Sequence, residues 1–148
     1  MHRFVLVTAA LVFAAASPAQ AKGLKWTDAP PGLPSGAKIA VVSGDPGKAG
    51  DFKIRIKMPA DYAVAPHHHP TDEVVRVKSG TLNYGMGEKV DKGNAGQLSD
   101  PKTHVTMQDG MNHWVFTTAP AEIEVSGMGP FQIIYADPKD DPRGTKAD

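Results

Sequence analysis

The sequence of 148 residues contains no cysteine and has no excess of either charge. Without cysteine, the chain cannot form a disulfide, a thiolate metal site or a cysteine nucleophile. Lys plus Arg number 16 and Asp plus Glu also number 16, so the formal net charge is +0. A nucleic-acid-binding protein normally has a basic excess, and an acidic disordered chain has the opposite imbalance. The composition argues against both classes of protein.

Long helical patterns are also missing, whereas turn-forming residues are abundant. The chain has 15 glycines and 13 prolines, and its apolar residues fall in short runs. Residues 51–58 alternate between apolar and charged side chains, which is typical of a half-buried β-strand. The pattern predicts an all-β single domain, an antiparallel sandwich or barrel. We expect short strands at 38–43, 51–58, 62–69, 73–78, 81–86, 102–107, 113–118, 121–126 and 131–136, with at most a helical turn in 87–98 and a turn at 127–130.

Residues 1–21 have the anatomy of a secretory signal peptide. Arg3 supplies a positive charge, an apolar run covers residues 4–16, and Ala19-Gln20-Ala21 fits a small-x-small cleavage site. A retained membrane anchor is the weaker alternative, because a spanning helix needs about 20 apolar residues. We therefore expect cleavage after Ala21, a periplasmic or secreted mature protein, and no membrane association once the leader is removed.

Two groups of residues, centred on histidines, carry the pattern of a metal site. Side chains two apart on a strand point to the same face, so His67 and His69 project together and His68 points away. Glu73 begins the returning strand after a tight turn, where its carboxylate can lie across from the pair. His113 follows a glycine turn at the start of another strand. Three imidazoles and one carboxylate suit one divalent transition metal, Fe, Mn, Zn, Ni or Cu, and four protein ligands leave coordination positions open.

The alternative is a set of histidines without a metal. A lone histidine is usually a surface residue or a satisfied core residue, and a triple histidine beside proline can be a solvent loop that binds metal adventitiously. Neither interpretation accounts for a glutamate that returns at this offset together with a separate glycine-linked histidine downstream.

The same residues resemble the conserved motifs of the cupin superfamily. The spacing His67-x-His69-x3-Glu73-x6-Gly80 is similar to the first motif, and Gly110-x2-His113 is similar to the core of the second. The resemblance extends over about residues 39–135. It implies a small β-barrel of the jelly-roll, or double-stranded β-helix, type, with a metal ion held by His67, His69, Glu73 and His113. The chain departs from the motifs at Asp61, Lys102, Gln108 and Thr117, none of which is a ligand position.

With this resemblance the chain divides into a signal peptide at 1–21, an N-terminal extension at 22–37, a barrel at 38–136 and a polar tail at 137–148.

Strand parity predicts the residues that surround the ion. Val75 and Val77 share the parity of Glu73, and Val115 and Thr117 share that of His113. These four side chains are expected to line an apolar pocket.

Other side chains are expected to serve packing or the surface. Trp114 and Phe116 have the parity opposite to His113, so packing is the expected role rather than substrate stacking. His104 is either a surface histidine or a proton shuttle beside the pocket.

Two classes of function follow. The first is a metal-dependent enzyme of oxygenase or isomerase type that acts on a small organic molecule, although no residue is identified as a dedicated general base. The second is a non-catalytic small-ligand-binding or metal-dependent sensor module of the cell envelope, favoured because little chain is left for specificity loops. The resemblance also implies a homodimer, although no residue pattern in the sequence indicates one.

Overall fold

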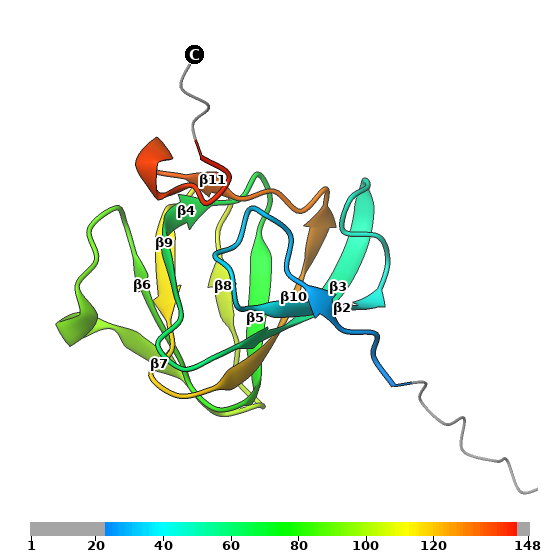
Figure 1. Ribbon diagram of the computed structural model, residues 1–148, viewed down its shortest axis with the longest axis horizontal. Helices are drawn as coiled ribbons and strands as arrows, with labels where there is room; N and C mark the ends of the chain where they lie inside the picture. Colours follow the sequence, from blue (N-terminus) through cyan, green and yellow to red (C-terminus); the bar gives the residue numbers. More distant parts are fainter. Residues whose placement is uncertain (1–22, 145–148) are drawn as a thin grey trace, which may run out of the picture.

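The computed structural model describes residues 23–144 and consists of two antiparallel sheets that face each other (Figure 1). Among these residues there is no α-helix, and therefore no helix that could cross a membrane. The all-β expectation is confirmed. The expected signal peptide, its cleavage site and the last four residues of the polar tail lie outside the described residues.

The two sheets differ in size. In spatial order, the larger sheet contains β1 (Thr27–Asp28), β2 (Lys38–Ser43), β3 (Gly50–Met58), β10 (Ala121–Gly129), β5 (Glu73–Ser79) and β8 (Val105–Met107). The smaller sheet contains β11 (Ile134–Tyr135), β4 (Ala63–His68), β9 (His113–Phe116), β6 (Leu82–Met86) and β7 (Gly96–Leu98). Two short 3₁₀ turns complete the chain, η1 (Lys92–Asn94) and η2 (Pro138–Asp140).

The centre of the larger sheet follows from the alternating pattern of β3. Ile54 lies opposite Val125 of β10, which lies opposite Val75 of β5, so β-branched side chains form a row across three strands. These residues are buried between the sheets. On the outer face, Arg55 contacts the carboxylates of both Glu122 and Glu124. Cross-strand rows of this kind are the unit that stabilises a sheet.

Several segments differ from the sequence-based expectation. The strands expected at 102–107 and 131–136 are shorter in the structure and cover only 105–107 and 134–135. Residues 96–98 form β7 against β6, where the sequence predicted a polar segment. The strand was not predicted because Leu98 is its one buried apolar residue. Residues 127–129 continue β10, where the sequence predicted a turn. Gly127 and Gly129 both remain paired with β3. Each must be a glycine, because a Cβ atom on Gly127 would clash with the carbonyl oxygen of Asp72 and one on Gly129 with that of Lys48. Turn residues can stay in a strand where another backbone approaches closely.

The segment that precedes β2 packs into the core rather than beside it. Leu33 and Ala37 are buried, and Leu33 belongs to the same core cluster as the strand residues. The Tyr62 hydroxyl donates to the Pro34 carbonyl at 2.7 Å, and the Tyr135 hydroxyl donates to the Gly32 carbonyl at 2.8 Å. In Figure 1 this blue segment runs across the front of the barrel. The core therefore draws on residues outside the 38–136 range.

Gly85 is a packing position that the fold requires. It pairs with Trp114, and a Cβ atom added at Gly85 would fall on the indole ring. We expect Gly85→Ala to lower the free energy of unfolding by about 1–3 kcal/mol, because overpacking forces the ring or the backbone to shift. Urea unfolding measures the change. Gly23→Ala is the matched control, since nothing lies within 4 Å of its Cβ position; equal stability of the two variants would contradict the packing argument.

Candidate metal centre

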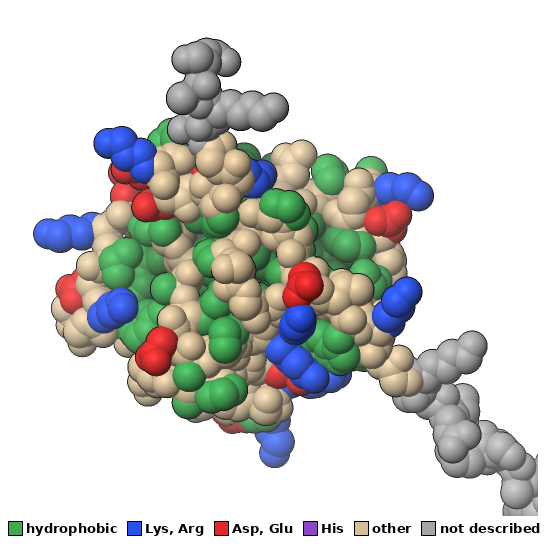
Figure 2. All heavy atoms as spheres, in the orientation of Figure 1, with side chains coloured by type: hydrophobic (Ala, Val, Ile, Leu, Met, Phe, Trp, Pro, Cys, Tyr) green, Lys and Arg blue, Asp and Glu red, His purple; other side chains and the backbone are tan. Residues whose placement is uncertain are grey.

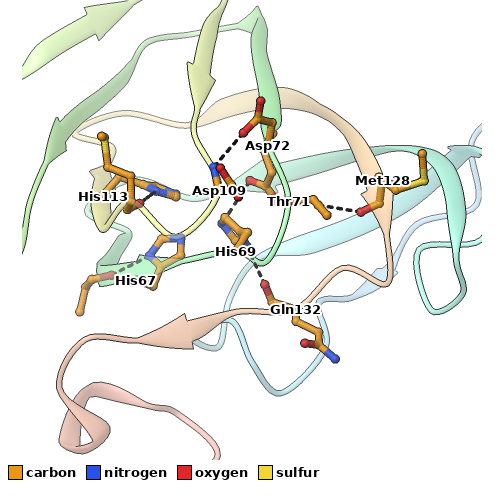
Figure 3. Close-up of polar contacts among 11 residues, drawn as sticks. His67, His69, Thr71, Asp72, Asp109, His113, Met128 and Gln132 are labelled. Atoms are coloured by element: carbon orange, nitrogen blue, oxygen red, sulfur yellow. Dashed lines mark hydrogen bonds and ion pairs between the residues drawn. The ribbon is translucent and has the colours of Figure 1, made fainter.

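Three histidines from two separate parts of the chain come together between the sheets. His67 ends β4 with His68, His69 follows that strand, and His113 begins β9. His67 lies directly opposite His113 in the antiparallel pair of β4 and β9. One ring nitrogen from each of the three histidines lies within 4.8 Å of the others, and all three side chains are buried. Figure 3 shows the rings turned toward a common point.

Each of these rings is held by a backbone carbonyl. The Nδ1 atoms of His67, His69 and His113 lie 2.7, 2.7 and 3.1 Å from the carbonyl oxygens of Ala65, Gln132 and Met111. A carbonyl oxygen only accepts, so each Nδ1 must carry the proton and donate it. The Nε2 atom of each ring then keeps its lone pair. An orienting hydrogen bond at the other ring nitrogen is what metal-binding histidines generally have.

The Glu73 carboxyl lies beside this group. Its Oε2 is 3.1 Å from Nε2 of His69, and the side chain is buried. Its Oε1 has no hydrogen-bond partner among residues 23–144. Glu73 is not part of the cluster whose atoms all lie within 4.8 Å of one another. A buried oxygen without a partner costs free energy, and a cation beside the three imidazoles would satisfy it.

Burial also sets the protonation of the four groups. It lowers the pKa of His67 to about 3 and that of His69 to about 4, and it lowers the pKa of His113 as well. It raises the pKa of Glu73 to about 8. At neutral pH the histidines are therefore uncharged and ready to bind a cation, whereas the carboxyl holds a proton that a cation would displace. This donor set fits the divalent transition metal that the motif implies.

Neighbouring loops hold the cluster in place. The Phe131 ring stacks on His69 at 5.5 Å between centroids. The Gly110 amide donates to the carbonyl of His69 at 2.9 Å, and the Asp109 amide donates to Asp72 at 2.8 Å. These bonds join the β4–β5 loop to the β8–β9 loop, as Figure 3 shows for Asp72 and Asp109. Space-filling spheres show no histidine on the face in Figure 2, where hydrophobic side chains gather over the middle.

The histidines and Glu73 border a cavity of about 40 Å³. Of the four expected pocket residues, Val75 and Val115 line it. Val77 and Thr117 are buried but do not line it, because each lies two residues farther along its strand direction than its lining neighbour. Thr117 instead donates its hydroxyl to the carbonyl of Pro59 at 2.7 Å. Parity selects the inner face of a strand, but it does not select the depth along the barrel.

Three cavity residues lie outside the strands and were not predicted from the sequence: Leu33, Phe131 and Ile133. An isolated large apolar residue among turn residues is the only signal that Leu33 offers.

The two other histidines among residues 23–144 stand apart from the cavity. His104 is exposed and does not line it, as the surface alternative predicts. His68 is half-buried, and its Nδ1 lies 3.0 Å from Oδ1 of Asn112, whose amide donates to Glu88. Trp114 and Phe116 stack on each other at 6.1 Å, outside the cavity lining.

Comparison with known proteins finds relatives in structure only. The sequence matches no family model, and the search of curated proteins returns no match. The chain is similar to DMSP lyase DddQ from Ruegeria pomeroyi, with a TM-score of 0.61 and 20% identity over 78% of this chain and 62% of that chain. It is similar to the polyketide cyclase RemF from Streptomyces resistomycificus, with a TM-score of 0.58 and 14% identity over 72% and 75%.

A third similar structure is an RmlC-like cupin from Shewanella frigidimarina, with a TM-score of 0.56 and 10% identity over 79% of this chain and 91% of that chain. Together with the two facing sheets, these likenesses show that the chain has the cupin fold.

The geometry separates His69 from its neighbour His68. We expect His69→Ala to remove most of the bound metal, since water does not replace an imidazole ligand at equal strength. His68→Ala should leave the metal content nearly unchanged, because this side chain is not in the cluster. Elemental analysis of the purified variants measures both. Near-stoichiometric metal in His69→Ala, or equal loss in both variants, would count against the site.

The raised pKa of Glu73 predicts a pH dependence of the metal-free protein. Between the ordinary carboxyl pKa of 4.5 and about 8, the folded state holds one more proton than the unfolded state. Stability therefore falls as pH rises through this window, by up to about 1.4 kcal/mol per pH unit. Around and below pH 6.5 the three histidines change the stability in the opposite direction, because the unfolded chain binds protons that the folded chain does not.

Urea unfolding of the metal-free protein at pH 6.5, 7.0, 7.5 and 8.0 measures this effect against Glu73→Gln. The histidine contribution is the same in both proteins, so it cancels in their difference. We expect the wild-type protein to lose about 2 kcal/mol of stability relative to the amide variant over this range, because the amide has no proton to lose. Parallel curves for the two proteins would show that the carboxyl is already ionised in the folded state.

Proposed function

We propose that the protein is an exported, metal-dependent enzyme of oxygenase or isomerase type that acts on a small organic molecule. The ion is one divalent transition metal, Fe, Mn, Zn, Ni or Cu. The proposal is carried by one observation: three buried imidazoles have Nδ1 held by backbone carbonyls, which leaves the lone pairs of Nε2 for a cation, and the buried Glu73 carboxyl lies 3.1 Å from Nε2 of His69. His67, His69, His113 and Glu73 would hold the ion.

The surroundings of the cluster favour chemistry over a purely structural role. Four protein ligands leave positions open on a five- or six-coordinate ion, and the ligands border a cavity. When bound, the ion would supply Lewis-acid chemistry or activation of dioxygen at those positions. The apolar walls, which include Val75, Val115 and Met107, would exclude water and strengthen the electrostatics of the site.

The protein's own side chains would fix the geometry. Phe131 stacks on His69 and limits its rotation, and the three carbonyl contacts keep each imidazole in one tautomer. Two of the similar solved structures are of enzymes, a DMSP lyase and a polyketide cyclase, which supports a small organic substrate for this chain as well. Their different chemistries leave the reaction open, since a fold does not fix a function.

A second candidate is a non-catalytic small-ligand-binding or metal-dependent sensor module. The cavity volume favours it: about 40 Å³ holds about three water molecules, which is little room for a reaction on a larger substrate.

We also propose that the protein is exported and forms a homodimer. Export to the periplasm or outside the cell rests on the leader-like sequence of residues 1–21. A homodimer through β2 is supported by the edge of the larger sheet, where β1 pairs only with Lys38 and Ile39. Beyond that pairing, Val41 and Val42 are 48% and 39% exposed. An apolar, partly unpaired edge strand is a surface that a second copy can cover.

Turnover separates the two candidates. The protein, purified from the periplasm or medium and loaded with Fe(II) or Mn(II), is offered one- and two-carbon carboxylates as well as phenols, diketones and sugars, while dioxygen consumption and product formation are followed. An enzyme gives turnover that His113→Ala lacks. Ligand-dependent quenching of Trp26 or Trp114 fluorescence without turnover would instead support the binding module. A chain that is retained in the cytoplasm and purifies without metal would contradict the proposal.

A further inference from the structure

A turn of the N-terminal segment forms part of the wall of the metal cavity. The Leu33 amide donates to the carbonyl of Pro30 at 3.0 Å and closes a turn. The Leu33 side chain is 6% exposed and lines the same cavity as the three histidines and Glu73. Pro30, Pro31 and Pro34 fix the backbone on both sides of this residue. The wall is therefore stiff, although it belongs to neither sheet.

Two buried phenols hold this turn on either side of Leu33. Tyr135 donates to the carbonyl of the preceding residue, Gly32, and Tyr62 donates to the carbonyl of the following residue, Pro34. Burial raises the pKa of both hydroxyls, that of Tyr135 to about 12. Both phenols therefore keep the proton that they donate at any physiological pH.

The turn is joined to the metal-binding residues through one short stretch of chain. Tyr135 pairs with His67 across β11 and β4, and the two rings are 5.8 Å apart. Gln132, three residues earlier, supplies the carbonyl that orients His69. Between them, Ile133 lines the cavity, and its Cδ1 would lie 3.8 Å from a Cβ atom added at Gly32. One short segment, residues 132–135, therefore contacts both the turn around Leu33 and the ligand His69.

We propose that Leu33 sets the upper size of the molecules that can reach the ion, so that the site takes ligands of a few heavy atoms. This inference rests on the proposed metal site. The present cavity of about 40 Å³ holds about three water-sized molecules. Dioxygen, azide or a one- or two-carbon carboxylate fits this room, whereas an aromatic carboxylate does not. The substitution Leu33→Ala removes an isopropyl group from the cavity wall. The prolines of the turn and the hydrogen bonds of Tyr62 and Tyr135 hold the backbone in place, so we expect the cavity to become larger.

Cobalt(II) makes the test possible without knowledge of the natural substrate. The cobalt-loaded wild-type protein, Leu33→Ala and Leu98→Ala are titrated with azide, acetate and benzoate, and the visible ligand-field spectrum reports binding at the ion. Leu98→Ala is the matched control, because Leu98 is a buried core leucine that does not line the cavity. Thermal unfolding confirms that each variant is folded, and Leu33→Val is the milder truncation for use if Leu33→Ala is not.

We expect azide to bind to all three proteins with similar affinity. Benzoate should bind to Leu33→Ala at least about tenfold more tightly than to the wild type or Leu98→Ala. Equal benzoate affinity in the three folded, cobalt-loaded proteins would overturn the role of Leu33 and leave the metal site standing. A wild-type protein that does not take up cobalt would overturn the metal site itself, and the inference with it.

Discussion

The metal site depends on three hydrogen bonds between histidine Nδ1 atoms and backbone carbonyls. Ala65, Gln132 and Met111 accept these bonds, and each bond fixes both the tautomer and the direction of one ring. Without these bonds, neither the tautomer nor the orientation of the three neutral imidazoles would be fixed, and their lone pairs would not point to a common position. The two sheets bring these three carbonyls and three rings together.

The two sheets meet this requirement through register. The pairing of His67 with His113 places two rings side by side, and β11 runs along β4 so that Gln132 and Phe131 reach His69. Burial then removes the protons from the imidazoles and keeps one on Glu73. Packing, protonation and ligand geometry therefore have the same origin, which is the depth of these residues between the sheets.

The sequence predicted the parts of this arrangement that depend on strand periodicity. The alternation in β3 and the parity of His67 and His69 are local properties, and the structure brings both histidines to one cluster with His113. Parity could not separate Val75, which lines the cavity, from Val77, which does not. Nor could it place Leu33, because the turn around it carries no periodic signal, and its burial depends on tyrosines far along the chain.

X-ray absorption spectroscopy of the metal-loaded protein tests the central claim most directly. The account predicts a first coordination shell of three imidazole nitrogens and at least one oxygen, with the multiple-scattering pattern of histidine rings. A spectrum with oxygen ligands only, or with a single imidazole, would show that the three rings do not converge on a cation and would contradict the account.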